Sequence, residues 1–229
     1  MPQPSHSQRL DSRAKDFQAR FAAFLADKRE AAVDVNQSVA EILAQVQSRG
    51  DAAVLDYTRK FDRVDYGADG LRLPAAALDD AMAKVPREQL DALRHAHGRI
   101  TSYHQRQLPR DDRYTDANGI ELGHRWTPVA AVGLYVPGGL AAYPSSVLMN
   151  AVPAKVAGVP RLAMTVPTPD GHLNPLVLAA ARIAGVGEVY RMGGAQAVAA
   201  LAYGTGQVPA VDKIVGPGNA YVAAAKRQV

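Results

Sequence analysis

The stretch that decides the fold runs from Val129 to Gly139 and reads VAAVGLYVPGG. A run of apolar, β-favouring residues ends abruptly in Pro-Gly-Gly, and a segment with helical spacing follows it. This pattern is typical of a buried parallel strand whose last residues reach a ligand site. The same pattern returns three more times before the end of the chain, so the sequence predicts four strand–turn–helix units.

The four units imply right-handed crossovers and a parallel sheet with helices on both faces. We expect strands at Val129–Val136, Leu162–Val166, Glu188–Met192 and Lys213–Val215. We expect helices near Ser146–Ala157, from Pro175 to Gly185, from Gln196 to Tyr203, and from Asn219 to the end of the chain. The predicted fold class is therefore α/β, with an incomplete Rossmann-like sheet.

The residues before this sheet predict a mainly helical region. A first helix is expected from Asp16 to about Lys28. A second is expected to begin at Ser38, because Ser38 and Glu41 have the spacing of a capping box. Gly50 supplies a stop signal, and Asp51 begins a third helix.

Two β features are expected within this helical region. Leu71–Leu73 reads as a short strand before a proline. Asn118-Gly119 lies between alternating residues and predicts a β-hairpin with a type I′ turn, which needs positive φ at both central positions. Pro128 separates a charged stretch from an apolar, glycine-rich one. We therefore divide the chain into residues 1–128, a mainly helical part of an incomplete first α/β domain, and residues 129–229, an α/β domain truncated in its last helix.

Composition excludes several classes of site. The 229 residues contain no cysteine, which rules out disulfides, thiolate-bound zinc, iron–sulfur clusters and a cysteine nucleophile within this sequence. The net charge of +4 is spread out, without the basic stripe and interleaved aromatics of a nucleic-acid binder. The sequence shows neither a secretory signal nor a membrane-spanning run, so we expect a cytoplasmic protein without a membrane partner.

The carboxyl ends of the predicted strands are the expected ligand site, as in other open parallel sheets. Glycine at such an end permits a tight turn and lets backbone N–H groups approach an anionic ligand. Three of the four ends carry closely spaced glycines, namely Gly138-Gly139, Gly193-Gly194, and Gly216 with Gly218. This favours a nucleotide or phosphate ligand, although neither G-x-G-x-x-G nor a Walker A sequence is present.

Three polar side chains at these ends are candidate ligand contacts: Tyr135, Gln196 and Asn219. Each has a structural alternative, since a strand tyrosine needs no ligand and an asparagine at a helix start is a common N-cap. The sequence shows no convincing acid–base pair, nucleophile or metal-ligand cluster. His97 and His104 share one helical stripe but are roughly 10 Å apart on a helix, too far for one ion.

These motifs resemble those of histidinol dehydrogenases. The matching stretches are GLYVPGG (133–139), SSVLMNAVPAKVAG (145–158), GGAQAVAALAYGT (193–205) and VDKIVGPGNAYVAAAKRQV (211–229), preceded in the same order by RGDAAVLDYTRKFD (49–62), RITSYHQRQ (99–107) and RWTPVAAVGLYVPGG (125–139). The resemblance covers nearly the whole chain from about Asn36.

The resemblance implies a zinc-dependent, NAD-linked oxidation of L-histidinol through histidinaldehyde to L-histidine, at the end of histidine biosynthesis, by a homodimer. The positions that contact NAD in that family match Tyr135, Gln196 and Asn219. The family's substrate serine, zinc ligands and Glu-His catalytic pair lie beyond the segment that matches the end of this chain. We therefore expect no catalytic or metal-binding residue before Val229, and residues 129–229 would be the NAD-binding domain.

Two other functional hypotheses remain open from the sequence. The first is that the chain is a non-catalytic nucleotide-binding module or an inactive fragment, because the catalytic half is missing; the chain alone is then expected to be inactive. The second is a relative of the general aldehyde dehydrogenases, which fits the βα pattern less specifically. Those enzymes use a cysteine nucleophile, and this sequence has none.

Overall fold

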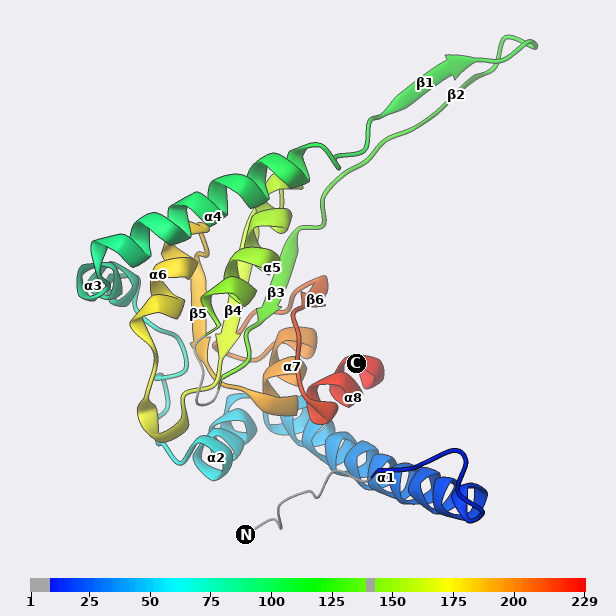
Figure 1. Cartoon of the computed structure of the whole chain (residues 1–229). Coiled ribbons are helices and arrows are strands. Elements are labelled where there is room, and N and C mark those ends of the chain that lie inside the picture. Colours follow the sequence, from blue (N-terminus) through cyan, green and yellow to red (C-terminus); the bar gives the residue numbers. More distant parts are fainter. Residues whose placement is uncertain (1–8, 139–142) are drawn as a thin grey trace.

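The computed structural model describes residues 9–138 and 143–229. Its centre is a four-stranded parallel sheet in the order β5-β4-β3-β6 (Figure 1). The strands are β3 (Ala131–Tyr135), β4 (Arg161–Val166), β5 (Glu188–Arg191) and β6 (Lys213–Val215). All four expected strands are present and parallel, which confirms the predicted α/β class.

Strand β3 is buried along its whole length because helices cover both faces of the sheet. Its side chains alternate between two cores, as the pleat requires. Val132 and Leu134 belong to one apolar cluster, whereas Tyr135 belongs to the other. A continuous apolar run in the sequence therefore corresponds to a strand with two buried faces.

Two layers of helices cover the first face of the sheet. Helices α5 (Pro144–Val156) and α6 (Pro175–Ile183) lie against the strands, and α3 (Ala76–Lys84) and α4 (Arg87–Gln105) pack behind them (Figure 1). A short 3-10 turn, η1 (Pro169–Gly171), connects β4 to α6. The helices before residue 106 therefore contribute to the same core as the sheet.

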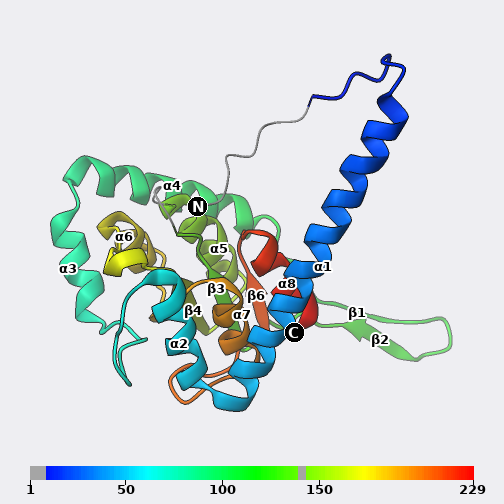
Figure 2. The same ribbon diagram turned by 90° about the horizontal axis from the view of Figure 1, so that it is seen from below.

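The second face carries α7 (Gly194–Tyr203) and α8 (Ala220–Gln228), with α1 (Phe17–Arg49) and α2 (Asp51–Asp62) packed over them (Figure 2). The chain thus uses its first two helices to cover elements that follow more than 130 residues later. This contact is what builds one wall of the cleft described below.

Helix α1 is a single helix of 33 residues, so the expectation of a new helix beginning at Ser38 is wrong. The capping box fails because the stripe that packs on α7 and α8 begins before Ser38, with the partly buried Val35, and continues through Val39 and Val46, so a break at Ser38 would interrupt it. Gly50 does end α1, with φ of 57°, and α2 begins at the next residue as expected. Within the described ranges, no helix has the length and apolar character needed to cross a membrane.

The predicted hairpin is present as β1 (Asp112–Thr115) and β2 (Glu121–His124), an antiparallel pair that projects from the body (Figure 1). Its turn is not of type I′, because Gly119 has φ of 79° but Asn118 has no positive φ. The Asp116 carboxylate accepts the N–H groups of Asn118 and Ile120, which holds a longer loop with glycine alone in the left-handed region. The expected strand at 71–73 is reduced to one antiparallel bridge between Arg72 and Tyr190.

Candidate functional site

The candidate site lies at the carboxyl edge of the sheet, where the strand order reverses. From β3 the chain steps outward to β4 and then β5, and it returns to the opposite side of β3 to form β6. In open parallel sheets the crevice at such a reversal is the usual ligand site, because the flanking connections diverge to opposite faces. The reversal here lies between β3 and β6.

A cleft of about 950 Å³ opens at this edge. Tyr135, Gln196 and Asn219 all line it, so the structure brings together the three residues singled out from the sequence. They come from the end of β3, the first turn of α7 and the start of α8. Their contact with a ligand stays a prediction, while their convergence on one cleft is a structural fact.

Gln196 is the most unusual polar group in the cleft. Its residue is 1% exposed, and its side-chain Oε1 is buried without a hydrogen-bond partner among the described residues. Gly194, with φ of 63°, leaves room for it, since a Cβ at that position would lie 2.6 Å from Oε1. Leaving a buried acceptor unpaired costs about 1–3 kcal/mol, so a ligand donor at this point would be stabilising.

Tyr135 is 5% exposed, and its hydroxyl accepts the Gly194 N–H at 3.1 Å. Burial raises the pKa of this phenol, and the nearby charge of Asp62 acts in the same direction. The hydroxyl therefore stays protonated. Because it already accepts from the backbone, its own O–H is left to donate.

Asn219 has the structural role that the sequence left open. Its Oδ1 accepts the Val222 N–H at 3.1 Å, which makes Asn219 the N-cap of α8. The cap occupies the side-chain oxygen, and the amide nitrogen is the atom through which a ligand contact would be made.

Glycines allow the strand ends to pack this closely. Gly216 has φ of 116°, and a Cβ there would overlap the backbone carbonyl of Tyr135. Gly138 and Gly193 face the same proline, Pro167 at the end of β4, from two neighbouring connections. Gly139, which was also predicted to belong to this turn, lies outside the described residues.

Sequence reasoning missed the opposite wall of the cleft. Helices α1 and α2 supply it, through Ser38, Glu41, Tyr57, Lys60 and Asp62. No periodicity marks these residues as functional, and the sequence reading assigned them to a different domain. Only the packing of α1 and α2 against α7 places them opposite Gln196.

Residues at the end of α2 and just after it hold this wall against the connection after β4. Asp62 Oδ2 accepts the Thr168 N–H at 2.8 Å, and the Tyr66 hydroxyl lies 2.5 Å from Thr168 Oγ1. Arg63 donates to both carboxylate oxygens of Asp170, at 2.8 and 2.5 Å, which lowers the pKa of Asp170. Burial raises the pKa of Asp62, and the hydrogen bond from Thr168 opposes that rise.

The comparisons with known proteins agree on one family. The histidinol dehydrogenase family model matches residues 25–229. The chain belongs to the histidinol dehydrogenase family. The histidinol dehydrogenases of Brucella abortus (strain 2308) and Rhodospirillum rubrum are each 62% identical to it, over 93% and 96% of this chain respectively.

A solved structure supports the same assignment. The crystal structure of histidinol dehydrogenase from Elizabethkingia anophelis matches with a TM-score of 0.80 at 30% identity, over 96% of this chain and 47% of that chain. The chain spans about half the length of the curated relatives it matches, at 50% of the Brucella abortus protein and 51% of the Rhodospirillum rubrum protein. Family membership and fold are therefore shown for this half.

The residues of this half do not fit the zinc that the family implies. Among residues 9–138 and 143–229, no group of three or more His, Cys, Asp or Glu side chains could hold a metal ion. The residues of the cleft do fit a dinucleotide, because the cleft offers an unpaired buried acceptor, a phenolic donor and strand ends lined by glycine.

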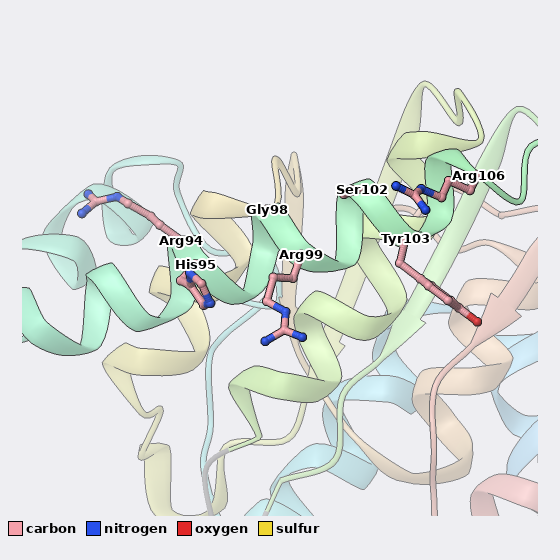
Figure 3. Close-up of a pocket in the computed structure, with 7 residues that line it drawn as sticks. All are labelled: Arg94, His95, Gly98, Arg99, Ser102, Tyr103 and Arg106. Carbon is pink, nitrogen blue, oxygen red and sulfur yellow. The ribbon is translucent and has the colours of Figure 1, made fainter.

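A second hollow, of about 550 Å³, lies on the outer surface of α4 (Figure 3). It is lined by residues of that helix, including Arg94, His95 and Arg99, and by Arg106 directly after it. Arg94 pairs with Asp91 at 3.0 Å, and the histidine and both arginines are exposed. This hollow is a solvated face of one helix, and it shares no residue with the cleft.

Proposed function

We propose that this chain forms the NAD-binding half of a histidinol dehydrogenase. The complete enzyme would be a cytoplasmic homodimer that oxidises L-histidinol through histidinaldehyde to L-histidine, with NAD as hydride acceptor and zinc as a further cofactor. The observation that carries the proposal is the unpaired Gln196 Oε1 in a cleft at the strand reversal, in a chain of this family. When bound, NAD would supply the acceptor for hydride.

The chain's own residues would bind and orient the dinucleotide. Gln196 Oε1 would accept a hydrogen bond from the ligand, and the Tyr135 O–H would donate one. The first turn of α7 and the capped start of α8 line the cleft, and helix N-termini favour an anionic group such as pyrophosphate. Pro167, packed against the glycine backbones, would keep this cradle rigid.

For the 229-residue chain by itself, we propose nucleotide binding without turnover. The described residues contain no cluster of metal ligands. The Tyr135 hydroxyl accepts the Gly194 N–H, and the Asp62 carboxylate accepts the Thr168 N–H and so holds the end of α2. We expect no histidinol-dependent NADH formation from this chain in a zinc-supplemented assay. Turnover by the purified chain would refute this second proposal.

Calorimetry with NAD tests the binding proposal directly. We expect the wild-type chain to bind NAD and Gln196→Ala to bind it about tenfold more weakly, because one buried hydrogen bond is lost. The matched control is Gln89→Ala, which removes the same side chain from an exposed position on α4. Equal affinity of the wild type and Gln196→Ala would remove Gln196 from the site, and no binding by the wild type would contradict the NAD proposal.

A further inference from the structure

Asp62 is the buried charge of the cleft. Three side chains among the described lining residues carry charge, namely Glu41, Lys60 and Asp62, and only Asp62 is buried, at 6% exposure. Its Oδ2 accepts the N–H of Thr168, a residue that is itself 0% exposed. No hydrogen-bond donor among the described residues reaches its other oxygen, Oδ1. The cleft therefore contains a fixed carboxylate with acceptor capacity to spare.

The ring next to Asp62 suits a flat base. Phe61 stacks on Tyr57 with ring centroids 5.8 Å apart and planes 10° apart, and both rings line the cleft. Phe61 is 44% exposed although Tyr57 stacks on its ring and Lys60 Nζ lies over it, so part of the ring still offers apolar surface to a ligand. Stacking on such a surface is how proteins commonly hold a nucleobase. A base placed there would bring its ribose towards the neighbouring carboxylate.

The chemistry of the wall selects hydroxyl groups and disfavours phosphate. A buried carboxylate accepts hydrogen bonds strongly from ligand O–H groups and repels a phosphate dianion. Lys60 would attract a phosphate, because its positively charged Nζ lies close to the same ring, 5.4 Å from the Phe61 centroid. That ammonium is exposed, so solvent screens it, whereas the charge of Asp62 acts from a buried position.

We propose that Asp62 accepts a hydrogen bond from the 2′-hydroxyl of the adenosine ribose and thereby excludes dinucleotides phosphorylated at that oxygen. Asp62 is then the residue that makes the site select NAD over NADP. This inference rests on the proposed NAD-binding function and adds to it a specificity-determining residue on α2. The sequence and the glycine-rich edge alone do not point to it.

The test is calorimetry of the 229-residue chain with NAD, NADP and ADP. We expect the wild type to bind NAD at least about tenfold more tightly than NADP. Asp62→Asn should reduce this preference by about tenfold, because the amide keeps an oxygen for the Thr168 N–H but presents a donor to the ligand. ADP keeps the adenosine ribose and lacks nicotinamide. In Asp62→Asn the affinity for ADP should therefore fall together with the affinity for NAD.

Two variants serve as controls. Asp170→Asn removes a charge from the same fastening between α2 and the β4 connection but does not line the cleft, so its NAD preference should equal that of the wild type. Asp62→Glu keeps the carboxylate, and it should keep the rejection of NADP even if total affinity changes. If Asp62→Asn unfolds, Asp62→Ser, which also removes the charge, takes its place in the comparison with the wild type and Asp62→Glu.

The possible results distinguish the role of Asp62 from the proposed binding of NAD. Equal wild-type affinity for NAD and NADP, or an unchanged preference in Asp62→Asn, overturns the role of Asp62 and leaves NAD binding intact. Loss of NAD affinity without loss of ADP affinity places Asp62 at the nicotinamide end and also overturns it. A wild-type chain that binds none of the three nucleotides contradicts the proposed function itself, and the inference then fails with it.

Discussion

The two edges of the central sheet are built in opposite ways. At the amino edge, Arg161 of β4 pairs with Glu188 of β5 at 2.9 Å and also donates to the carbonyls of Pro209 and Ala210. Tyr190 donates its O–H to the same glutamate at 2.9 Å. The carboxylate of Asp212 accepts the Ala131 N–H at 2.7 Å. The Arg161–Glu188 pair and the Asp212 carboxylate thus hold the strand starts at this edge.

The carboxyl edge leaves polar groups unpaired around an open cleft. Gln196 Oε1 and the Thr165 hydroxyl are buried there without partners among the described residues. Glycines and one proline surround the strand ends there, and the ion pair between Arg63 and Asp170 joins α2 to the connection after β4 and does not link two strands. The two edges therefore differ in construction, because cross-strand pairing closes the amino edge, whereas the carboxyl edge carries an open cleft. The following substitutions test that difference, from the largest expected effect to the smallest.

Gly216→Ala should be the most damaging change, although it lies beside an open cleft. A side chain there would require a left-handed φ and would overlap the Tyr135 carbonyl, so we expect a loss of about 3 kcal/mol or more in unfolding free energy. Urea denaturation measures it. Gly187→Ala is the matched control, because nothing lies within 4 Å of its added Cβ. Similar stability of the two variants would show that the carboxyl edge tolerates repacking.

Arg161→Met should weaken the amino edge without affecting ligand binding. Arg161 and Glu188 are 25% and 17% exposed, so we expect a loss of about 1–2 kcal/mol, between the values for surface and buried pairs. Arg161 lowers the pKa of Glu188, so wild-type stability should fall as pH drops through that depressed pKa, and the variant should lose this dependence. Arg182→Met, which breaks an exposed pair with Asp79, is the control. A changed NAD affinity in Arg161→Met would couple the two edges and break the comparison.

Gln196→Met should stabilise the chain while weakening NAD binding. An apolar side chain of similar length removes the unpaired buried acceptor, which we expect to add about 1 kcal/mol to the unfolding free energy. Thermal denaturation and calorimetry on the same sample give both values. Lower stability with retained NAD affinity would show that Gln196 is structural.

Titration of Tyr190 should change stability least at neutral pH, because the change appears only under alkaline conditions. Burial and the bond to Glu188 raise the pKa of Tyr190 from 10.0 to about 12. The unfolded chain loses this proton first, so stability should be constant below the ordinary value and fall as pH rises through the window up to about 12. Tyr190→Phe should lose this part of the pH profile, whereas the more exposed Tyr203→Phe should keep it. Identical profiles for wild type and Tyr190→Phe would contradict a closed amino edge.

The sheet could be predicted from the sequence because each strand contains its own local signal. Apolar runs that stop at glycine or proline gave all four strands to within about two residues, and Asn118-Gly119 gave the hairpin. Tyr135, Gln196 and Asn219 could be predicted as neighbours because the ends of parallel strands share an edge. Their role in binding NAD is still a prediction.

The other wall could not be predicted, because it depends on contacts between distant segments. The Ser38–Glu41 motif has the local form of a helix start, yet the stripe that packs on α7 and α8 already begins at Val35 and runs to Val46, which overrides it. Asp62 and Thr168 are 106 residues apart in the sequence, and no local pattern near Asp62 predicts the hydrogen bond between them. Local rules also failed at Asn118, where the side chain of Asp116 selected a different turn.

The continuity of α1 also makes it a lever. Its 33 residues span about 50 Å. The helix is held to the body by the buried stripe from Val39 to Val46, which acts as the fulcrum and lies beside Ser38 and Glu41 in the cleft wall. The other end reaches away from the body to Phe17 (Figure 2). A tilt of about 10° at the fulcrum would swing that end by about 6 Å. Small movements of the cleft wall are thus magnified at the far tip, where a distance probe would register them.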